Sequence, residues 1–159
     1  IQMVKKINII FILIISFLMV SCGYKKVSQN RPLIHVQNIT IDGENRISSF
    51  LKNDIKLFSN KNAVTKYDLV VNLKKTKRDK IKNLSGKVTR YELNISANLV
   101  LKDNTNKKIT NKSFNKEGSF DVAKNHFETI SNEKIMTSII MSQLSDEIIN
   151  FITFSNKNK

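Results

Sequence analysis

The chain has 159 residues, and its 27 Lys and Arg side chains against 13 Asp and Glu give a formal net charge of +14. That length suits one domain, and a composition that is 40% hydrophobic and 25% charged excludes a disordered chain, a coiled coil and a collagen-like fibre. The single cysteine excludes a disulfide framework and a cysteine-based zinc site, because each needs at least two thiols.

Residues 1–21 have the order of a secretory signal peptide. Lys5 and Lys6 precede an apolar run from Ile7 to Val20, and Ser21 is the small residue before the expected cleavage site. The run would reach only about 21 Å as a helix, short of the roughly 30 Å hydrocarbon core of a bilayer. A stable membrane span is therefore the weaker interpretation.

The sole cysteine, Cys22, comes directly after this segment. Met19-Val20-Ser21-Cys22 resembles the lipobox of bacterial lipoproteins, in which the cysteine becomes the mature N-terminus and carries fatty acyl chains such as palmitate. Three chains would anchor a protein stably, and Gly23 is not the Asp that retains such lipoproteins at the inner membrane. We expect a lipid-anchored protein on the periplasmic side of a Gram-negative outer membrane; the alternative is a secreted protein with a free cysteine near its start.

The polar segment 22–32 shows no periodicity and is predicted to be a flexible, lipidated tether. A single folded domain is expected over 33–154, with a basic tail over 155–159. The first strand is predicted from Leu33 to Ile41, where the alternation of apolar residues changes phase and so indicates a β-bulge.

An amphipathic helix is predicted next, because apolar residues recur at three- and four-residue spacing from Ile47 to Phe58. It follows a turn at Asp42-Gly43, and either Asp42 or Asn45 could cap its N-terminus.

Three strands are expected after this helix, the first from Tyr67 to Lys74. The longest alternation runs from Arg90 to Lys102, with one apolar and one polar face. A polar turn over 103–106 then leads to a Lys-rich returning strand from Lys107 to Phe114 or beyond, as expected of a sheet edge.

The last predicted helix carries a broad apolar stripe from Ile135 to Ile152, with Ser131 as its cap and Glu133 in its first turn. The element order is therefore β-α-β-β-β-α. We expect a two-layer α+β sandwich, in which both helices pack on one face of a four-stranded, mostly antiparallel sheet.

Catalytic motifs are not recognisable in the sequence. His35 and His126 are far apart and lie in no known catalytic or metal-binding motif, and the glycines are isolated rather than clustered into a phosphate-binding loop. The pair Asp146-Glu147 is most simply the solvated face of the last helix. We expect no enzymatic activity, cofactor or metal; the alternative is a lipoprotein hydrolase that works without a recognisable motif.

Basic residues are densest at the end of the second predicted strand and in the loop that follows it. The cluster comprises Lys74, Lys75, Lys77, Arg78, Lys80, Lys82 and Lys87. It could clamp an anionic ligand such as a lipid phosphate, since export removes nucleic acid as a partner. Because all but four of the 27 basic residues are Lys, the cluster could equally be a solvated loop of a protein from an AT-rich genome.

From Tyr67 to Ile152 the chain resembles the lipopolysaccharide-assembly lipoprotein family. The resemblance rests on the strand from Tyr91 to Leu101 with its polar hairpin, on Ser119-Phe120 before the last helix, and on the start Cys22-Gly23-Tyr24. It implies a βαβββα sandwich that plugs the lumen of a large outer-membrane β-barrel, binds lipopolysaccharide and catalyses nothing. Under this resemblance the lipopolysaccharide-binding candidates are Lys74, Lys75, Lys77, Arg78 and Lys80.

The polar face of the strand from Arg90 to Lys102 supplies the barrel-facing candidates Asn94, Ser96 and Asn98, because the lumen of a barrel is polar and water-lined. A sheet that simply faces solvent predicts the same pattern. A different periplasm-facing lipoprotein, serving as a subunit of another envelope transport or assembly complex, would share every feature except the partner.

Overall fold

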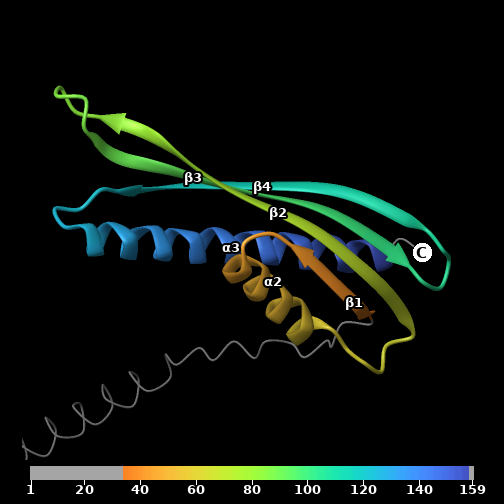
Figure 1. The fold of residues 1–159 in the computed structure, drawn as a ribbon. Helices are drawn as coiled ribbons and strands as arrows, with labels where there is room; N and C mark the ends of the chain where they lie inside the picture. Colours follow the sequence, from red (N-terminus) through yellow and green to blue (C-terminus); the bar gives the residue numbers. More distant parts are fainter. Residues whose placement is uncertain (1–33, 158–159) are drawn as a thin grey trace, which may run out of the picture. The chain divides into compact units, whose positions relative to one another are not determined.

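The computed structural model describes residues 34–157, and the elements follow the predicted order (Figure 1). They are β1 (Ile34–Asp42), α2 (Asn45–Phe58), β2 (Thr65–Lys82), β3 (Val88–Asp103), β4 (Ile109–Asp121) and α3 (His126–Lys157). The signal peptide, Cys22 and the tether over 22–32 lie outside the described residues.

The four strands form one sheet in the order β1-β2-β3-β4. β1 runs parallel to β2, whereas β2 with β3 and β3 with β4 are antiparallel hairpin pairs. The pairing of β1 with β2 shifts register between Val36 and Asn38, which confirms the β-bulge expected from the change of phase. The mostly antiparallel α+β sheet is thus as predicted.

Both helices lie on the same side of the sheet (Figure 1). The core fills the space between the layers because β3 alternates strictly: Leu93, Ile95, Ala97 and Leu99 are buried beneath the helices. α3 contributes Ile140, Leu144, Ile148 and Ile152, and α2 contributes Ile47, Leu51 and Ile55, in both cases at four-residue spacing. We call the other side of the sheet, which neither helix covers, the open face.

β2 is longer than predicted. Apolar alternation ends at Leu73, but the strand continues to Lys82 because its backbone stays paired with β3 as far as Val88. The segment expected to be a long basic loop is therefore strand, and the loop itself is only residues 83–87. We call residues 74–92 the hairpin arm; in Figure 1 it rises away from α3.

The starts of both helices differ from the prediction. α3 begins at His126, because Asn125 rather than Ser131 caps it: Asn125 Oδ1 accepts a hydrogen bond from the Glu128 N–H at 2.7 Å, six residues before the predicted cap. α2 is preceded by Glu44, and no side chain caps it, so neither Asp42 nor Asn45 has the expected role.

α3 also continues through residues 155–157, which the sequence placed in a basic tail. Between residues 34 and 157 neither helix is both long and apolar enough to cross a membrane.

Candidate functional site

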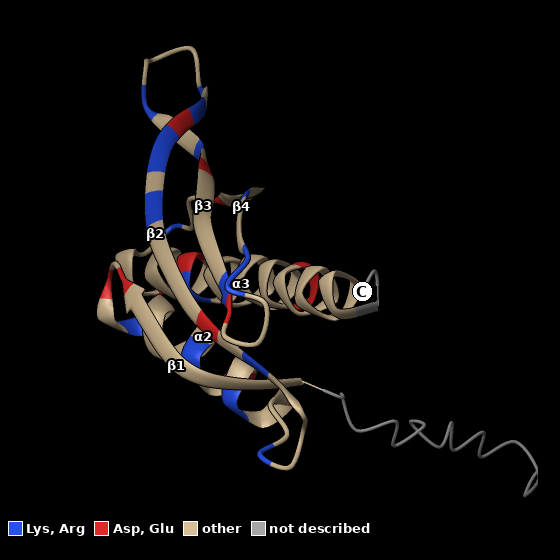
Figure 2. Ribbon diagram, turned by 90° about the vertical axis from the view of Figure 1, so that its right-hand side faces the viewer, with Lys and Arg blue, Asp and Glu red and all other residues tan. Residues whose placement is uncertain are grey.

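The hairpin arm carries the predicted basic cluster. Figure 2 shows the blue segments along the upper part of β2, close to the turn that leads to β3. Lys74 to Lys82 lie in the strand and Lys87 in the turn after it. Because neighbouring residues of a strand point to opposite faces, the cluster cannot act as a single patch.

Lys75 and Lys77 point to the helix side of the sheet, where they meet α3. Lys75 Nζ lies 3.0 Å from Glu133 Oε1, and Lys77 Nζ lies 2.8 Å from Glu133 Oε2. Burial alone would raise the pKa of Glu133, but the hydrogen bonds from Lys77 and Lys75 outweigh it and hold that pKa below its ordinary value. These two lysines therefore join the arm to α3.

Lys77 also lies over an aromatic pair. Its Nζ is 5.1 Å from the centre of the Tyr91 ring, and the Tyr91 and Phe120 rings are 5.6 Å apart. The base of the arm is thus held to β4 by aromatic packing and to α3 by ion pairs.

Arg78 and Lys80 meet Glu92 across the β2–β3 ladder. Arg78 Nη2 lies 2.7 Å from Glu92 Oε1, and Lys80 Nζ lies 3.5 Å from Glu92 Oε2. The hydrogen bond from Arg78 lowers the pKa of Glu92 and keeps the carboxylate charged although its side chain is only 11% exposed. Both cations remain open to solvent and could still contact an anion.

Lys74 is exposed on the open face and makes no ion pair with another described residue. Of the five lipopolysaccharide-binding candidates, the structure therefore brings Lys74, Arg78 and Lys80 to solvent in one stretch of β2, and turns Lys75 and Lys77 toward α3. The acidic partners Glu92 and Glu133 were not identified from the sequence, because their pairing depends on strand register and helix packing.

The tip of the arm is an ordered turn. Asn83 Oδ1 accepts hydrogen bonds from the N–H groups of Ser85 and Lys87, at 3.1 and 2.9 Å, and Gly86 adopts a φ of 78°. Leu84 is fully exposed at this tip. The arm therefore presents an apolar side chain in a tip that Lys82 and Lys87 flank in the sequence.

The open face holds the three barrel-facing candidates. Asn94, Ser96 and Asn98 alternate with the buried residues of β3, and the register places Asn115 and Ser113 of β4 beside them. Ser113 Oγ donates a hydrogen bond to Asn98 Oδ1 at 2.8 Å. Around these residues the face is lined by amide and hydroxyl groups of β3 and β4, whereas further along it Val70 and Val100 are exposed.

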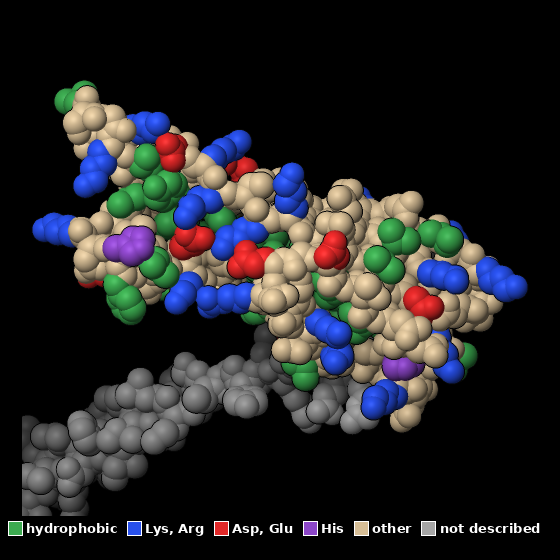
Figure 3. All heavy atoms as spheres, viewed as in Figure 1, with side chains coloured by type: hydrophobic (Ala, Val, Ile, Leu, Met, Phe, Trp, Pro, Cys, Tyr) green, Lys and Arg blue, Asp and Glu red, His purple; other side chains and the backbone are tan. Residues whose placement is uncertain are grey.

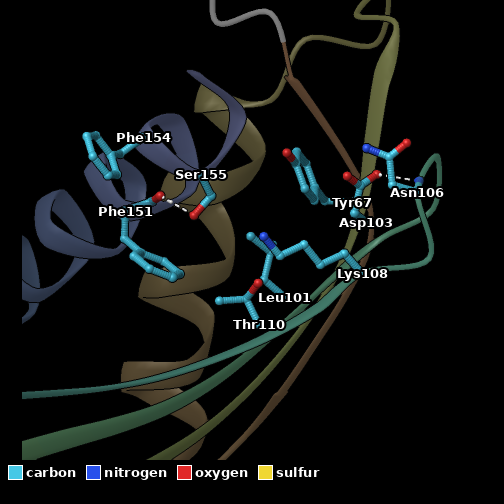
Figure 4. A pocket seen from close by; sticks show the side chains of 9 residues that line it. All are labelled: Tyr67, Leu101, Asp103, Asn106, Lys108, Thr110, Phe151, Phe154 and Ser155. Atoms are coloured by element: carbon cyan, nitrogen blue, oxygen red, sulfur yellow. Dashed lines mark hydrogen bonds between the residues drawn. The ribbon is translucent and has the colours of Figure 1, made fainter. Parts of the chain in front are cut away.

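A hollow of about 340 Å³ lies where the start of β2 and the end of β3 approach the C-terminal part of α3 (Figure 4). Phe151 and Phe154 line it from α3, and Tyr67 and Asp103 line it from the sheet. Asp103 Oδ1 accepts a hydrogen bond from the Thr105 N–H at 2.9 Å and so fixes the β3–β4 turn. Asp103 is therefore a structural residue of this turn.

The chain matches no protein-family model and no curated protein. Solved bacterial structures do share its fold. Rare lipoprotein B from Shewanella oneidensis has a TM-score of 0.58 at 11% identity, over 76% of this chain and 97% of that chain. An uncharacterised lipoprotein B from Nitrosomonas europaea has a TM-score of 0.54 at 15% identity, over 81% and 90%.

A candidate lipoprotein from Caulobacter crescentus has a TM-score of 0.54 at 15% identity, over 80% of this chain and 92% of that chain. Such low identities establish a common fold rather than a common activity. The β-α-β-β-β-α sandwich of this chain is therefore one that bacterial lipoproteins adopt.

Proposed function

We propose that this chain is an outer-membrane lipoprotein, lipidated at Cys22, that acts without catalysis as the plug and assembly partner of a large β-barrel. The barrel would deliver lipopolysaccharide to the cell surface, and the chain would bind both the barrel and lipopolysaccharide from the periplasmic side. The lipobox-like sequence before Cys22, the fold shared with bacterial lipoproteins and the resemblance from Tyr67 to Ile152 support this proposal.

The open face is the observation that carries the proposal. A four-stranded sheet with a helical layer on one side leaves its other side for solvent or for a partner. Asn94, Ser96 and Asn98 would supply hydrogen bonds to the polar wall of a barrel lumen, where an apolar surface would leave polar groups unpaired. An acyl anchor on Cys22 would hold the chain at the membrane in which such a barrel would lie.

Lipopolysaccharide would meet the chain on the hairpin arm. Lys74, Arg78 and Lys80 point to solvent, and an Arg offers a bidentate contact to a phosphate where a Lys offers a point charge. Glu92 fixes the Arg78 side chain and so reduces the entropy lost on binding.

Photocrosslinking from the open face tests the proposal. A photoreactive amino acid in place of Asn94, Ser96 or Asn98, in the full lipidated chain, should attach it to a large outer-membrane β-barrel protein. The matched position is Asn53 on α2, which is exposed like Asn98 but belongs to the helical layer. We expect several-fold less product from this position.

Crosslinks from the open face to a different envelope protein would mean that the partner is not a barrel. The chain would then be a subunit of another transport or assembly complex. Open-face positions that crosslink to no membrane protein, in cells where the lipidated chain is present, would contradict both versions of the proposal.

A further inference from the structure

A second basic surface lies at the opposite end of the domain from the tip of the arm. Between Lys52 and Lys66 the chain has four lysines and only one acidic residue, Asp54. Two large apolar side chains in this stretch are almost completely exposed: Leu57 at 87% and Val64 at 90%. We call Lys52, Lys56, Leu57, Lys61 and Val64 the entry surface.

Three of these lysines line a groove of about 510 Å³ beside β1. Lys52 and Lys56 are one helical turn apart on α2 and therefore share a face, and Lys61 follows in the loop. The groove has no Asp or Glu among its lining residues, while His35 lines its β1 side. Figure 3 shows blue side chains gathered at the lower right, over α2 and the start of β1. This end of the domain would therefore attract anions.

The loop after α2 is held firmly to the edge of the sheet. Ser59 Oγ accepts a hydrogen bond from the Val36 N–H at 2.9 Å and lies 3.0 Å from His35 Nδ1. The Asn60 N–H donates to the Ile34 carbonyl at 3.1 Å. Lys61 and Val64 are thus carried by a loop that is bonded to the first described residues of the chain.

The hydrogen bond between Asn60 and Ile34 places the first described residue of the chain beside this loop. Ile34, which begins β1, is bonded to the loop that carries the entry surface. Cys22 lies twelve residues earlier in the sequence, and a chain of that length spans at most about 40 Å. An acyl anchor on Cys22 would therefore keep this end of the domain close to the membrane.

We propose that the entry surface binds the bilayer leaflet that holds the anchor. Lys52, Lys56 and Lys61 would contact the phosphates of anionic phospholipids, while Leu57 and Val64 would enter the headgroup region. The inference rests on the lipidation of Cys22, which is part of the proposed function, but not on the β-barrel or on lipopolysaccharide. It would orient the domain with the hairpin arm directed away from the bilayer.

Vesicle binding of the unlipidated chain tests this surface directly. The core residues that the structure describes lie between Ile34 and Ile152, so a chain from residue 23 onward retains them, and its thermal melt tests folding. It should bind vesicles of phosphatidylcholine mixed with phosphatidylglycerol and bind phosphatidylcholine alone much more weakly. Lys52→Gln, Lys56→Gln and Lys61→Gln together should lower the affinity for these vesicles about tenfold or more. Added salt should weaken vesicle binding by the unsubstituted chain.

The control removes the same charge elsewhere. Lys112, Lys124 and Lys134 are exposed on β4, on the loop after it and on α3, at the far edge of the sheet and near the start of the helix. Their replacement by Gln should change the affinity at most about threefold. Leu57→Ser with Val64→Ser should also weaken binding and leave the melting temperature unchanged, because both side chains are exposed.

Equal losses of vesicle affinity in the two triple lysine variants would overturn the inference. Equal binding to vesicles with and without phosphatidylglycerol would overturn it as well. A dimer that Leu57→Ser breaks, without vesicle binding, would assign the surface to a second copy and overturn it too. Vesicle binding by a chain that does not crosslink to a barrel would contradict the proposed function and leave this inference standing.

Discussion

Adjacent lysines of one strand have different roles in this protein. The Lys75 side chain is 19% exposed and bonded to Glu133, whereas Lys74 lies exposed on the other face of the sheet. Charge density along the sequence cannot separate these two, because alternate residues of a strand face opposite directions. The distinction leads to opposite expectations for stability and for binding.

Lys75→Gln should destabilise the domain by roughly 1 kcal/mol, because Glu133 loses an ion pair in a partly screened position. Lys74→Gln should change the free energy of unfolding by less than about 0.5 kcal/mol, as for other exposed substitutions. Urea denaturation of the two variants measures both values. An equal effect would mean that the Lys75–Glu133 contact contributes nothing to stability.

Glu133 should also make the stability depend on pH. Its pKa in the folded protein is lower than the ordinary value of 4.5, so its contribution is complete above that value and is lost as the pH falls through the lower, folded pKa. Denaturation at acidic pH should show a smaller loss of stability for Glu133→Gln than for the unsubstituted chain. Part of the loss should remain, because the pKa values of Glu92 and Asp121 are also lowered, by hydrogen bonds from Arg78 and Arg90 respectively. Superimposable pH profiles would contradict this role of Glu133.

At the scale of elements, apolar periodicity was sufficient to predict the order of strands and helices. It located β3 because Leu93 to Leu101 alternate without interruption, and α3 because its stripe is broad. It could not follow β2 past Leu73, since the strand there is held by backbone pairing with β3 and not by burial.

The same limit applies to the site. Sequence located the basic cluster and the polar face, but not the strand register that sets Arg78 beside Glu92 or the packing that sets Glu133 beside Lys77. The early start of α3 did have a local signal, because Asn125 with Glu128 three residues later is a capping pattern. It was missed because apolar periodicity begins further along the helix.

Two glycines with positive φ provide a matched test of the turns. At Gly43 φ is 142°, and an added Cβ would lie 2.7 Å from the Leu73 carbonyl oxygen, so the β1–α2 turn packs against β2. At Gly86 φ is 78° and an added Cβ would meet nothing within 4 Å. Gly43→Ala should therefore cost roughly 2–3 kcal/mol, and Gly86→Ala about 1 kcal/mol. Thermal melts that rank the two in the reverse order would show that the β1–α2 turn can relax.

At the scale of the whole molecule, the sandwich carries three candidate binding surfaces. The entry surface lies at the start of β1, the hairpin arm projects from the other end of β2, and the open face extends between them. The described core is confined to the interface of the two layers, so the exposed residues of each surface can be altered without disturbing it. The arm borders the open face at Lys74, which pairs with Ser96 in the β2–β3 register, so arm variants that include Lys74 are tested with purified lipopolysaccharide.

Lys74→Gln, Lys80→Gln and Lys87→Gln together should weaken lipopolysaccharide binding and leave the melting temperature almost unchanged. The reason is that Arg78 still holds Glu92, so no carboxylate loses its last partner, and exposed charges contribute little to stability. The comparison is Lys107→Gln, Lys108→Gln and Lys112→Gln, which removes the same charge near the β3–β4 turn.

Salt dependence decides whether the contact is electrostatic. Screening limits the reach of exposed charges to roughly 8 Å at physiological ionic strength. Added salt should therefore weaken lipopolysaccharide binding most for the unsubstituted chain and least for the triple variant of the arm. If both triple variants bind lipopolysaccharide alike, the lysines of the arm are solvated surface. Because Leu84 is fully exposed between them at the tip, an apolar contact with the acyl chains would then be the remaining way for the arm to bind lipid, and Leu84→Ser would test it.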